Sequence, residues 1–355
     1  MNKSKKIYPI VNLAFKIIIA LLSIGYLSYV LFFQENEYID PATGEKAVLN
    51  LSYLSGNVIK IVSSQPNSIF VLSCILLLVI ANWGVEIIKW KALVGKLLKV
   101  SYKLAAVSII GGVAASNMTP LRLGGFFARV AQLPVKYRVK SMAIIFLGDI
   151  AQLLSTLFLG SLSSLLLIYS NLNKKSVFEI QTDTLVTIAG AAFVMTGIAC
   201  VIFMFLNRFA RTLHHIPFLK NRKNTWNILD AFNYRKTSAK LLLISTARLL
   251  IISTQYYLAF TLFGFNLGLF KSLLIINTLF LIYNFLPTFN IIEFGITKSA
   301  ILIFLLKSFI SPDFVTLNVA VVVSCGSFLI WLVNLAIPSA VGSFFLFRIK
   351  LFNHK

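Results

Sequence analysis

The strongest constraint on the fold of this chain is a series of apolar segments that are each long enough to cross a lipid bilayer. They lie at about residues 11–33, 68–90, 142–169, 185–206, 241–263 and 314–347. A spanning helix needs about 20 apolar residues, because the hydrocarbon layer is about 30 Å thick. Charged residues make up only 12% of the 355 residues, about half of their share in soluble domains. The sequence therefore predicts an all-α polytopic membrane protein that forms a single integral membrane domain over residues 1–355.

The net charge of +22 comes from basic clusters that flank these apolar segments. Lys and Arg concentrate in the cytoplasmic loops of membrane proteins, so topology explains the charge and no nucleic-acid partner is expected. The most basic segment, about residues 207–240, is predicted to be a cytoplasmic loop. The same rule places both termini in the cytoplasm. A surface this basic attracts anionic lipid, at about 1 kcal/mol for each Lys or Arg near the membrane.

Residues 117–125 interrupt an apolar stretch that begins at 105 and is too short to cross the membrane before the interruption. Pro120 and the pair Gly124 and Gly125 stand where a spanning helix would continue, and Arg122 lies between them. Proline and glycine break helices and permit tight turns. Asn117 is expected to cap the preceding half-helix or to satisfy freed backbone groups.

A second interruption, at residues 284–295, repeats this pattern between two short apolar arms at 270–285 and 296–309. Asn284 corresponds to Asn117, Pro287 and Gly295 break the helix, and Glu293 adds an acid. If the first interrupted segment crossed the membrane once, the basic cluster at 136–140 would lie outside. We therefore expect two re-entrant hairpins, about 105–135 from the cytoplasm and about 270–309 from outside. Opposed broken helices of this kind mark the binding site in transporters built from inverted repeats.

Few charged residues lie inside the apolar segments: Glu86, Asp149, Glu293, Arg122 and Arg248. Each charge costs about 2.5 to 3.5 kcal/mol at the bilayer centre on insertion scales, so such residues are expected to be paired and functional. Arg122 and Arg248 suit a lipid phosphate, because a guanidinium can bind it through two hydrogen bonds. The alternative is a structural pair of Arg122 with Asp149 or Glu293. For Glu293, proton exchange and pairing with Arg248 both remain open.

Glu86 has a simpler interpretation. It lies three residues before Lys89 near the end of its apolar segment, so an ion pair within one helix turn, or extension of the side chain to the interface, would explain it.

Signatures of enzymes and metal sites are missing from the sequence. The chain has no Walker loop, no G-x-S-x-G and no H-E-x-x-H. Its three cysteines lie inside apolar runs, and its three histidines lie in loops or the tail. No catalytic residue, metal or cofactor is therefore expected.

Asn117, Pro120, Arg122 and Gly124, followed by a basic stretch and by Asp149, resemble the signature of the lysylphosphatidylglycerol synthase transmembrane family. The later segments 286–288 and 293–295 are similar to that family's second signature. The resemblance implies a multi-pass protein of the bacterial cytoplasmic (inner) membrane that handles polar lipids. In the bifunctional members the membrane domain flips aminoacylated phosphatidylglycerol and a separate domain makes it. No such catalytic domain is recognised here, so the implied role is translocation.

The chain departs from the family pattern at two places. Residues 145–148 before Asp149 lack the arginine that members usually carry, and residues 290–292 are poor in glycine. The head group that is recognised can therefore differ from the lysyl lipid.

The sequence thus predicts a lipid flippase whose partners are anionic phospholipids or lipid phosphate head groups. The alternative is a membrane enzyme or accessory subunit of envelope lipid or polyprenyl-phosphate glycolipid synthesis, and a third reading is a scaffold whose hairpins only pack. Assembly into a homo-oligomer stays open. The predicted substrate-binding residues are Arg122, Arg248, Asp149, Glu293, Asn117 and Asn284, and the predicted hairpin-shaping residues are Pro120, Gly124, Gly125, Pro287 and Gly295.

Overall fold

The computed structural model confirms a helical membrane protein. It describes residues 37–39, 46–48, 59–60, 63, 67–117, 123–171, 176–177, 180–205, 234–285, 296–310 and 317–348. Within these residues five helical stretches are long and apolar enough to cross a membrane: Ser68–Val94, Val135–Tyr169, Thr182–Met204, Lys236–Leu262 and Val319–Phe345. They correspond to five of the six predicted spans. The predicted first span, at about 11–33, lies outside the described residues.

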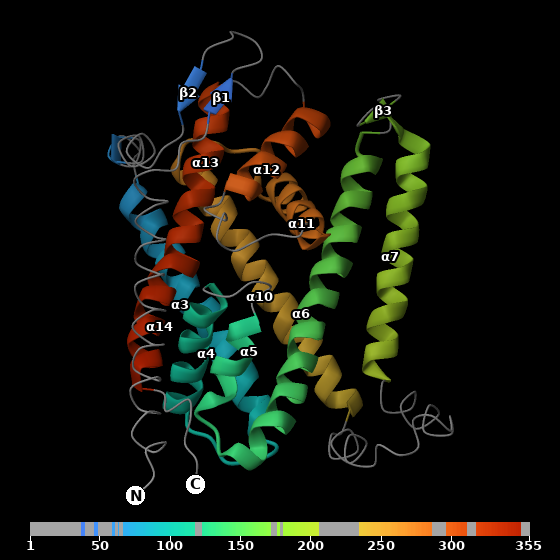
Figure 1. Ribbon diagram of the computed structural model, residues 1–355. Helices are drawn as coiled ribbons and strands as arrows, with labels where there is room; N and C mark the ends of the chain where they lie inside the picture. Colours follow the sequence, from blue (N-terminus) through green and yellow to red (C-terminus); the bar gives the residue numbers. More distant parts are fainter. Residues whose placement is uncertain are drawn as a thin grey trace, which may run out of the picture.

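The long helices form one bundle (Figure 1). Helix α10 (Tyr234–Leu262) runs obliquely through its middle and packs against α3 (Ser68–Val94), α6 (Val135–Tyr169) and α13 (Leu317–Trp331). Helix α7 (Thr182–Met204) lies at the edge and packs mainly against α6. Its exposed side chains include Ile188, Val194, Met195 and Ile198. An apolar exposed face of this kind suits contact with lipid tails.

Two pairs of short helices lie at opposite ends of the bundle (Figure 1). Helices α4 (Tyr102–Asn117) and α5 (Leu123–Ala131) occupy one end, and α11 (Leu269–Phe285) and α12 (Ile296–Phe309) occupy the other. The two members of each pair are in contact. Helix α5 has 9 residues, a length of about 14 Å, which is too short to cross a bilayer. The turns between the partners, at 118–122 and 286–295, lie outside the described residues, and the re-entrant paths remain a prediction.

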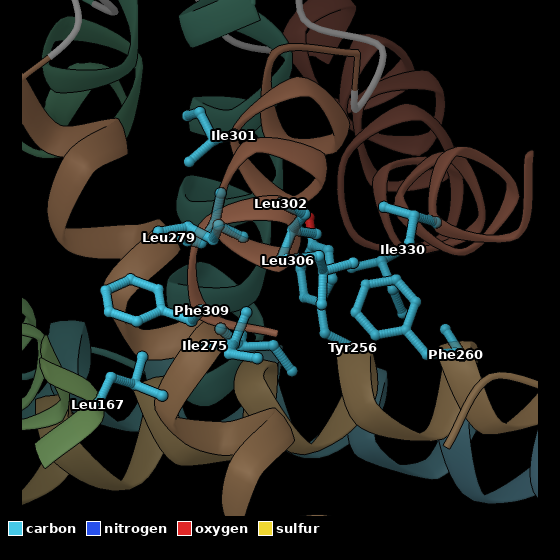
Figure 2. Packing of buried hydrophobic residues seen from close by; sticks show 14 of the residues in the cluster. Leu167, Tyr256, Phe260, Ile275, Leu279, Ile301, Leu302, Leu306, Phe309 and Ile330 are labelled. Atoms are coloured by element: carbon cyan, nitrogen blue, oxygen red, sulfur yellow. The ribbon is translucent and has the colours of Figure 1, made fainter. Parts of the chain in front are cut away.

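The largest apolar core lies where α10, α11 and α12 meet (Figure 2). Tyr256 and Phe260 from α10 face Ile275 and Leu279 from α11 and Leu302 from α12. All five are nearly inaccessible to solvent. This core fixes the second short pair against the long helices.

Two small antiparallel hairpins add strands that the all-α prediction did not include. One joins β1 (Glu37–Ile39) to β2 (Lys46–Val48). The other joins β3 (Ser176–Val177) to β4 (Ile180–Gln181) immediately before α7.

Helices α6 and α10 begin earlier than the apolar pattern predicted. Helix α6 starts at Val135 instead of about 142, and α10 starts at Tyr234 instead of about 241. Their first turns carry Lys and Arg, which are good helix formers with apolar stems that can reach along a membrane interface. Apolar periodicity marks only the embedded part of such helices and therefore misses these turns.

The last spanning stretch contains a π-helical turn, η4 (Leu332–Ala336), between α13 and α14 (Ile337–Arg348). Pro338 follows within two residues of the turn. Proline has no backbone N–H, so the carbonyl of Asn334, four residues earlier, cannot receive its α-helical hydrogen bond. A proline inside a helix therefore commonly produces a kink, and a π turn is one recognised form of such an irregularity.

Candidate functional site

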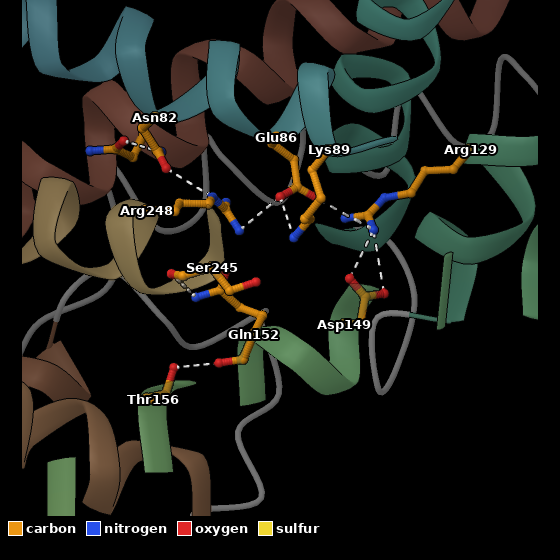
Figure 3. Close-up of polar contacts among 10 residues, drawn as sticks. Asn82, Glu86, Lys89, Arg129, Asp149, Gln152, Thr156, Ser245 and Arg248 are labelled. Atoms are coloured by element: carbon orange, nitrogen blue, oxygen red, sulfur yellow. Dashed lines mark hydrogen bonds and ion pairs between the residues drawn. The ribbon is translucent and has the colours of Figure 1, made fainter. Parts of the chain in front are cut away.

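A buried carboxylate, Glu86 of α3, lies at the centre of an ionic network within the helix bundle (Figure 3). Its Oε2 atom lies 2.7 Å from Nζ of Lys89 and 3.2 Å from Nη1 of Arg248. Its Oε1 atom lies 3.9 Å from Nη1 of Arg129. The side chain of Glu86 is only 3% exposed. One acid from α3 thus faces cations from its own helix, from α5 and from α10.

Arg129 extends the network to α6. Its Nη1 atom lies 3.3 Å from Oδ1 and 3.4 Å from Oδ2 of Asp149. Asp149 is more accessible than Glu86, with 32% of its side chain exposed. Arg129 therefore lies between a buried acid on α3 and a partly exposed acid on α6.

Amides continue the network from Arg248 toward the π turn. Nε of Arg248 donates to Oδ1 of Asn82 at 2.9 Å, and Nδ2 of Asn82 donates to Oδ1 of Asn334 at 2.9 Å. Nδ2 of Asn334 in turn donates to Oε1 of Gln255 at 3.0 Å. The guanidinium carbon of Arg248 also lies 5.8 Å from the ring centre of Trp83. A continuous polar path therefore joins α3, α10 and η4.

The network carries an excess of positive charge. Among the described residues it contains three cations, Lys89, Arg129 and Arg248, and two acids, Glu86 and Asp149, which leaves a net charge of +1. In a medium of low dielectric constant an uncompensated charge is costly and attracts an opposite charge strongly. The arrangement is thus suited to hold an anion.

The sequence model of the lysylphosphatidylglycerol synthase TM region matches residues 47–292 of the chain. The chain belongs to this family. The match confirms the resemblance drawn from the two interrupted stretches. The ionic network lies within the matched region, whereas Asn334 lies beyond it. No curated protein and no solved structure matches the chain.

Two residues predicted for the site, Asp149 and Arg248, lie in the network. Asn117 ends α4, and its Nδ2 atom donates to Oγ of Ser339 in α14. Nδ2 of Asn284 donates to the carbonyl oxygen of Phe280, one turn earlier in its own helix, at 2.7 Å. The other predicted residues lie outside the described part of the chain: Arg122, Glu293, Pro120, Pro287 and Gly295.

Gly124 and Gly125 lie inside α5 and not in the turn before it, where they were predicted to permit the chain reversal. Gly125 allows the two short helices to approach closely, because a Cβ atom there would collide with Oγ of Ser116 and lie 3.1 Å from the carbonyl oxygen of Gly112. Gly112 in turn lies against Arg129, whose Cγ atom would be 2.7 Å from a Cβ at that position. The two glycines thus allow α4 and α5 to pack closely, and this packing positions Arg129.

The pair of Glu86 with Lys89 within one helix turn, the first of the two explanations offered by the sequence, was predicted correctly. Both side chains are 3% exposed and thus buried within the bundle, and arginines from two other helices complete the cluster. Arg129 was missed altogether. It lies inside the predicted first hairpin, and an arginine in a segment expected at membrane depth was the available signal.

Proposed function

We propose that this member of the family is a flippase that moves a polar phospholipid head group across the cytoplasmic membrane, with the ionic network as its intramembrane polar site. The observation that carries this function is the cluster of five charges, centred on the buried Glu86, that α3, α5, α6 and α10 contribute. Charges inside a membrane bundle are expensive and usually mark a substrate or ion pathway.

The chemistry of the cluster supports a phosphate ligand. Arg129 and Arg248 provide guanidinium groups, which can bind phosphate oxygens through paired hydrogen bonds. The side chain of each arginine is 18% exposed, so each is reachable in part. Glu86 holds both arginines near each other, because it pairs with each of them.

The position of the short helix pairs supports transport. They occupy opposite ends of the bundle (Figure 1), as expected if α4 and α5 enter from the cytoplasm and α11 and α12 enter from outside. The flippase would then have about six spanning helices, two opposed re-entrant hairpins and cytoplasmic termini. Inverted repeats of this kind place the substrate site between the hairpins and allow access from alternate sides.

The distribution of basic residues supports the same orientation. The end of α3 and the starts of α6 and α10 lie at the same end of the bundle (Figure 1). These helix ends carry Lys91, Lys136, Lys140, Lys236 and Lys240. By the positive-inside rule, this end faces the cytoplasm.

Transport can be tested with the purified protein in proteoliposomes that contain fluorescent phosphatidylglycerol, by following the loss of inner-leaflet fluorescence after dithionite has bleached the outer leaflet. Arg248→Gln should lower the initial rate of flipping at least about tenfold, because a charge-assisted contact of about 1.5 kcal/mol or more is lost. Lys140→Gln is the matched control, since Lys140 is exposed and lies outside the network. It should flip lipid at the wild-type rate.

Equal flipping rates for the wild type and Arg248→Gln would show that the network is not part of the transport pathway. Arg122→Ala tests the predicted phosphate contact at the first interruption in the same way. Native mass spectrometry of the purified protein addresses the lipid class: a co-purified anionic phospholipid supports the flippase, and a polyprenyl phosphate would favour a role in glycolipid synthesis.

A further inference from the structure

Arg129 makes no close contact with either acid of the network: its Nη1 atom lies 3.9 Å from Oε1 of Glu86 and 3.3 Å from Oδ1 of Asp149, the more exposed of the two acids. Both of its contacts with Asp149 use this nitrogen, at 3.3 and 3.4 Å, whereas Glu86 and Lys89 approach to 2.7 Å. The side chain of Asp149 is 32% exposed and that of Glu86 is 3% exposed. The carboxylate of Asp149 can therefore regain water when it separates from Arg129, which the carboxylate of Glu86 cannot do without rearrangement of the bundle.

Arg129 keeps unused hydrogen-bonding capacity in this arrangement. Its Nε atom is buried and has no hydrogen-bond partner among the described residues. Its contacts to Glu86 and Asp149 all involve Nη1. A guanidinium has five N–H donors in a fixed fork, and a buried donor without an acceptor is costly. A ligand with several acceptor oxygens would satisfy Arg129 better than Asp149 does.

We propose that Asp149 is an internal substitute for the substrate: it neutralises Arg129 while the site is empty, and the phosphodiester of a lipid head group displaces it from Arg129. Glu86 then serves as the permanent counter-ion that keeps Arg129 in place. This role of Asp149 rests on the proposed lipid transport, and it makes Asp149 a competitor of the head group at Arg129. The sequence prediction had instead placed Asp149 among the residues that bind the substrate.

The charge of the cluster defines the class of ligand. With Asp149 present, the described residues of the network carry +1, which one phosphodiester charge neutralises. The site therefore takes a lipid with a single negative charge on its phosphate. The phosphate group is shared by lipids and by small soluble phosphates, and the exposed apolar surface of the surrounding helices favours the lipid.

Binding can be measured by native mass spectrometry of the purified full-length protein in detergent, with dioctanoyl phosphatidylglycerol as the titrated ligand. Asp149→Asn should bind this lipid about tenfold more tightly, since removal of a competing ion pair of about 1.4 kcal/mol corresponds to that factor. Asp183→Asn is the matched control. Asp183 is an exposed residue in the first turn of α7, so the same chemical change there should leave the affinity unchanged.

The contribution of Arg129 is isolated by a double-mutant cycle. Arg129→Gln should weaken binding, and Asp149→Asn should give no tightening when Arg129→Gln is also present. Asp149→Glu keeps the competing charge and should bind as the wild type does. Thermal unfolding of each variant in the same detergent identifies any variant that has lost its fold, and the conclusion then rests on Asp149→Glu and on the remaining variants.

Three results would overturn the competitor role: weaker or unchanged binding by Asp149→Asn, tightening that persists without Arg129, or glycerol phosphate displacing the lipid as well as free dioctanoyl lipid does. The proposed flippase function has a separate readout. Transport by a protein whose affinity does not respond to Asp149→Asn would refute the competitor role alone. Tightened binding without any flipping in proteoliposomes would refute the flippase alone.

Discussion

Replacement of Glu86 by glutamine should strongly destabilise the protein, because it removes one charge from the centre of the network while keeping the size of the side chain. At an effective dielectric constant of about 20, the contacts at 2.7, 3.2 and 3.9 Å correspond to attractions of about 6, 5 and 4 kcal/mol. Most of this attraction offsets desolvation and the mutual repulsion of the three cations. Measured losses on removing one partner of a buried pair are about 3 to 5 kcal/mol.

For a chain of this size, such a loss corresponds to a decrease in Tm of about 4 to 7 °C. Thermal unfolding in detergent, followed by the fluorescence of buried tryptophans or by circular dichroism, would measure it. The reason for the loss can be tested by a second substitution. Lys89→Met added to Glu86→Gln returns the network charge from +2 to its wild-type value of +1, because Lys89 is the cation nearest to Glu86.

The double variant should recover at least half of the lost Tm, since an apolar side chain of similar length can replace the lysine in a buried position. Asp183→Asn, an exposed loss of one negative charge, should not change Tm. A Tm for Glu86→Gln within about 2 °C of the wild type would show that the network does not hold the bundle together, and the electrostatic reasoning would fail.

Two further predictions concern packing and the amide path. Gly342→Ala should lower Tm, because a Cβ atom at Gly342 would collide with the backbone of Ile110 in α4. Gly190 has open space around it, so Gly190→Ala should leave Tm unchanged or raise it slightly. Equal Tm values for the two variants would contradict the close contact of α14 with α4. Asn334→Leu should lower the free energy of unfolding by about 1 to 3 kcal/mol, because Asn82 and Gln255 each lose a hydrogen-bond partner. An unchanged Tm for Asn334→Asp would indicate that the polar path tolerates a charge and does not depend on the amide.

The spanning helices were predictable because bilayer thickness imposes a minimum length on apolar segments. Residues 142–169 and 185–206 were located in this way to within about two turns of α6 and one turn of α7. The short helices were predictable for a related reason, since Pro, Gly and Arg interrupt segments too short to span. The pairing within one turn of Glu86 with Lys89 followed from sequence spacing alone.

The partners between helices were not predictable from one sequence. Asn82 and Asn334 are 252 residues apart, and Arg248 is 166 residues from Asn82. Their contact depends on the rotation and depth of three helices, which apolar periodicity specifies poorly when a helix is hydrophobic on every side. The pairing of Asp149 with Arg129, which the sequence did not suggest, depends in the same way on how α5 packs against α6.

The π turn before Pro338 changes the rotation of α14 about its axis relative to α13, compared with a continuous α-helix. A π turn accommodates one residue more than an α turn, and each residue of an α-helix advances the helix by about 100°. Return of Leu332–Ala336 to α-helical geometry would therefore rotate α14 by about 100° relative to α13. That rotation would separate Asn117 from Ser339 and turn Gly342 away from α4. The pairing of Asn334 with Asn82 and Gln255 thus fixes the angular position of α14, and with it the surface of α14 against which α4 packs.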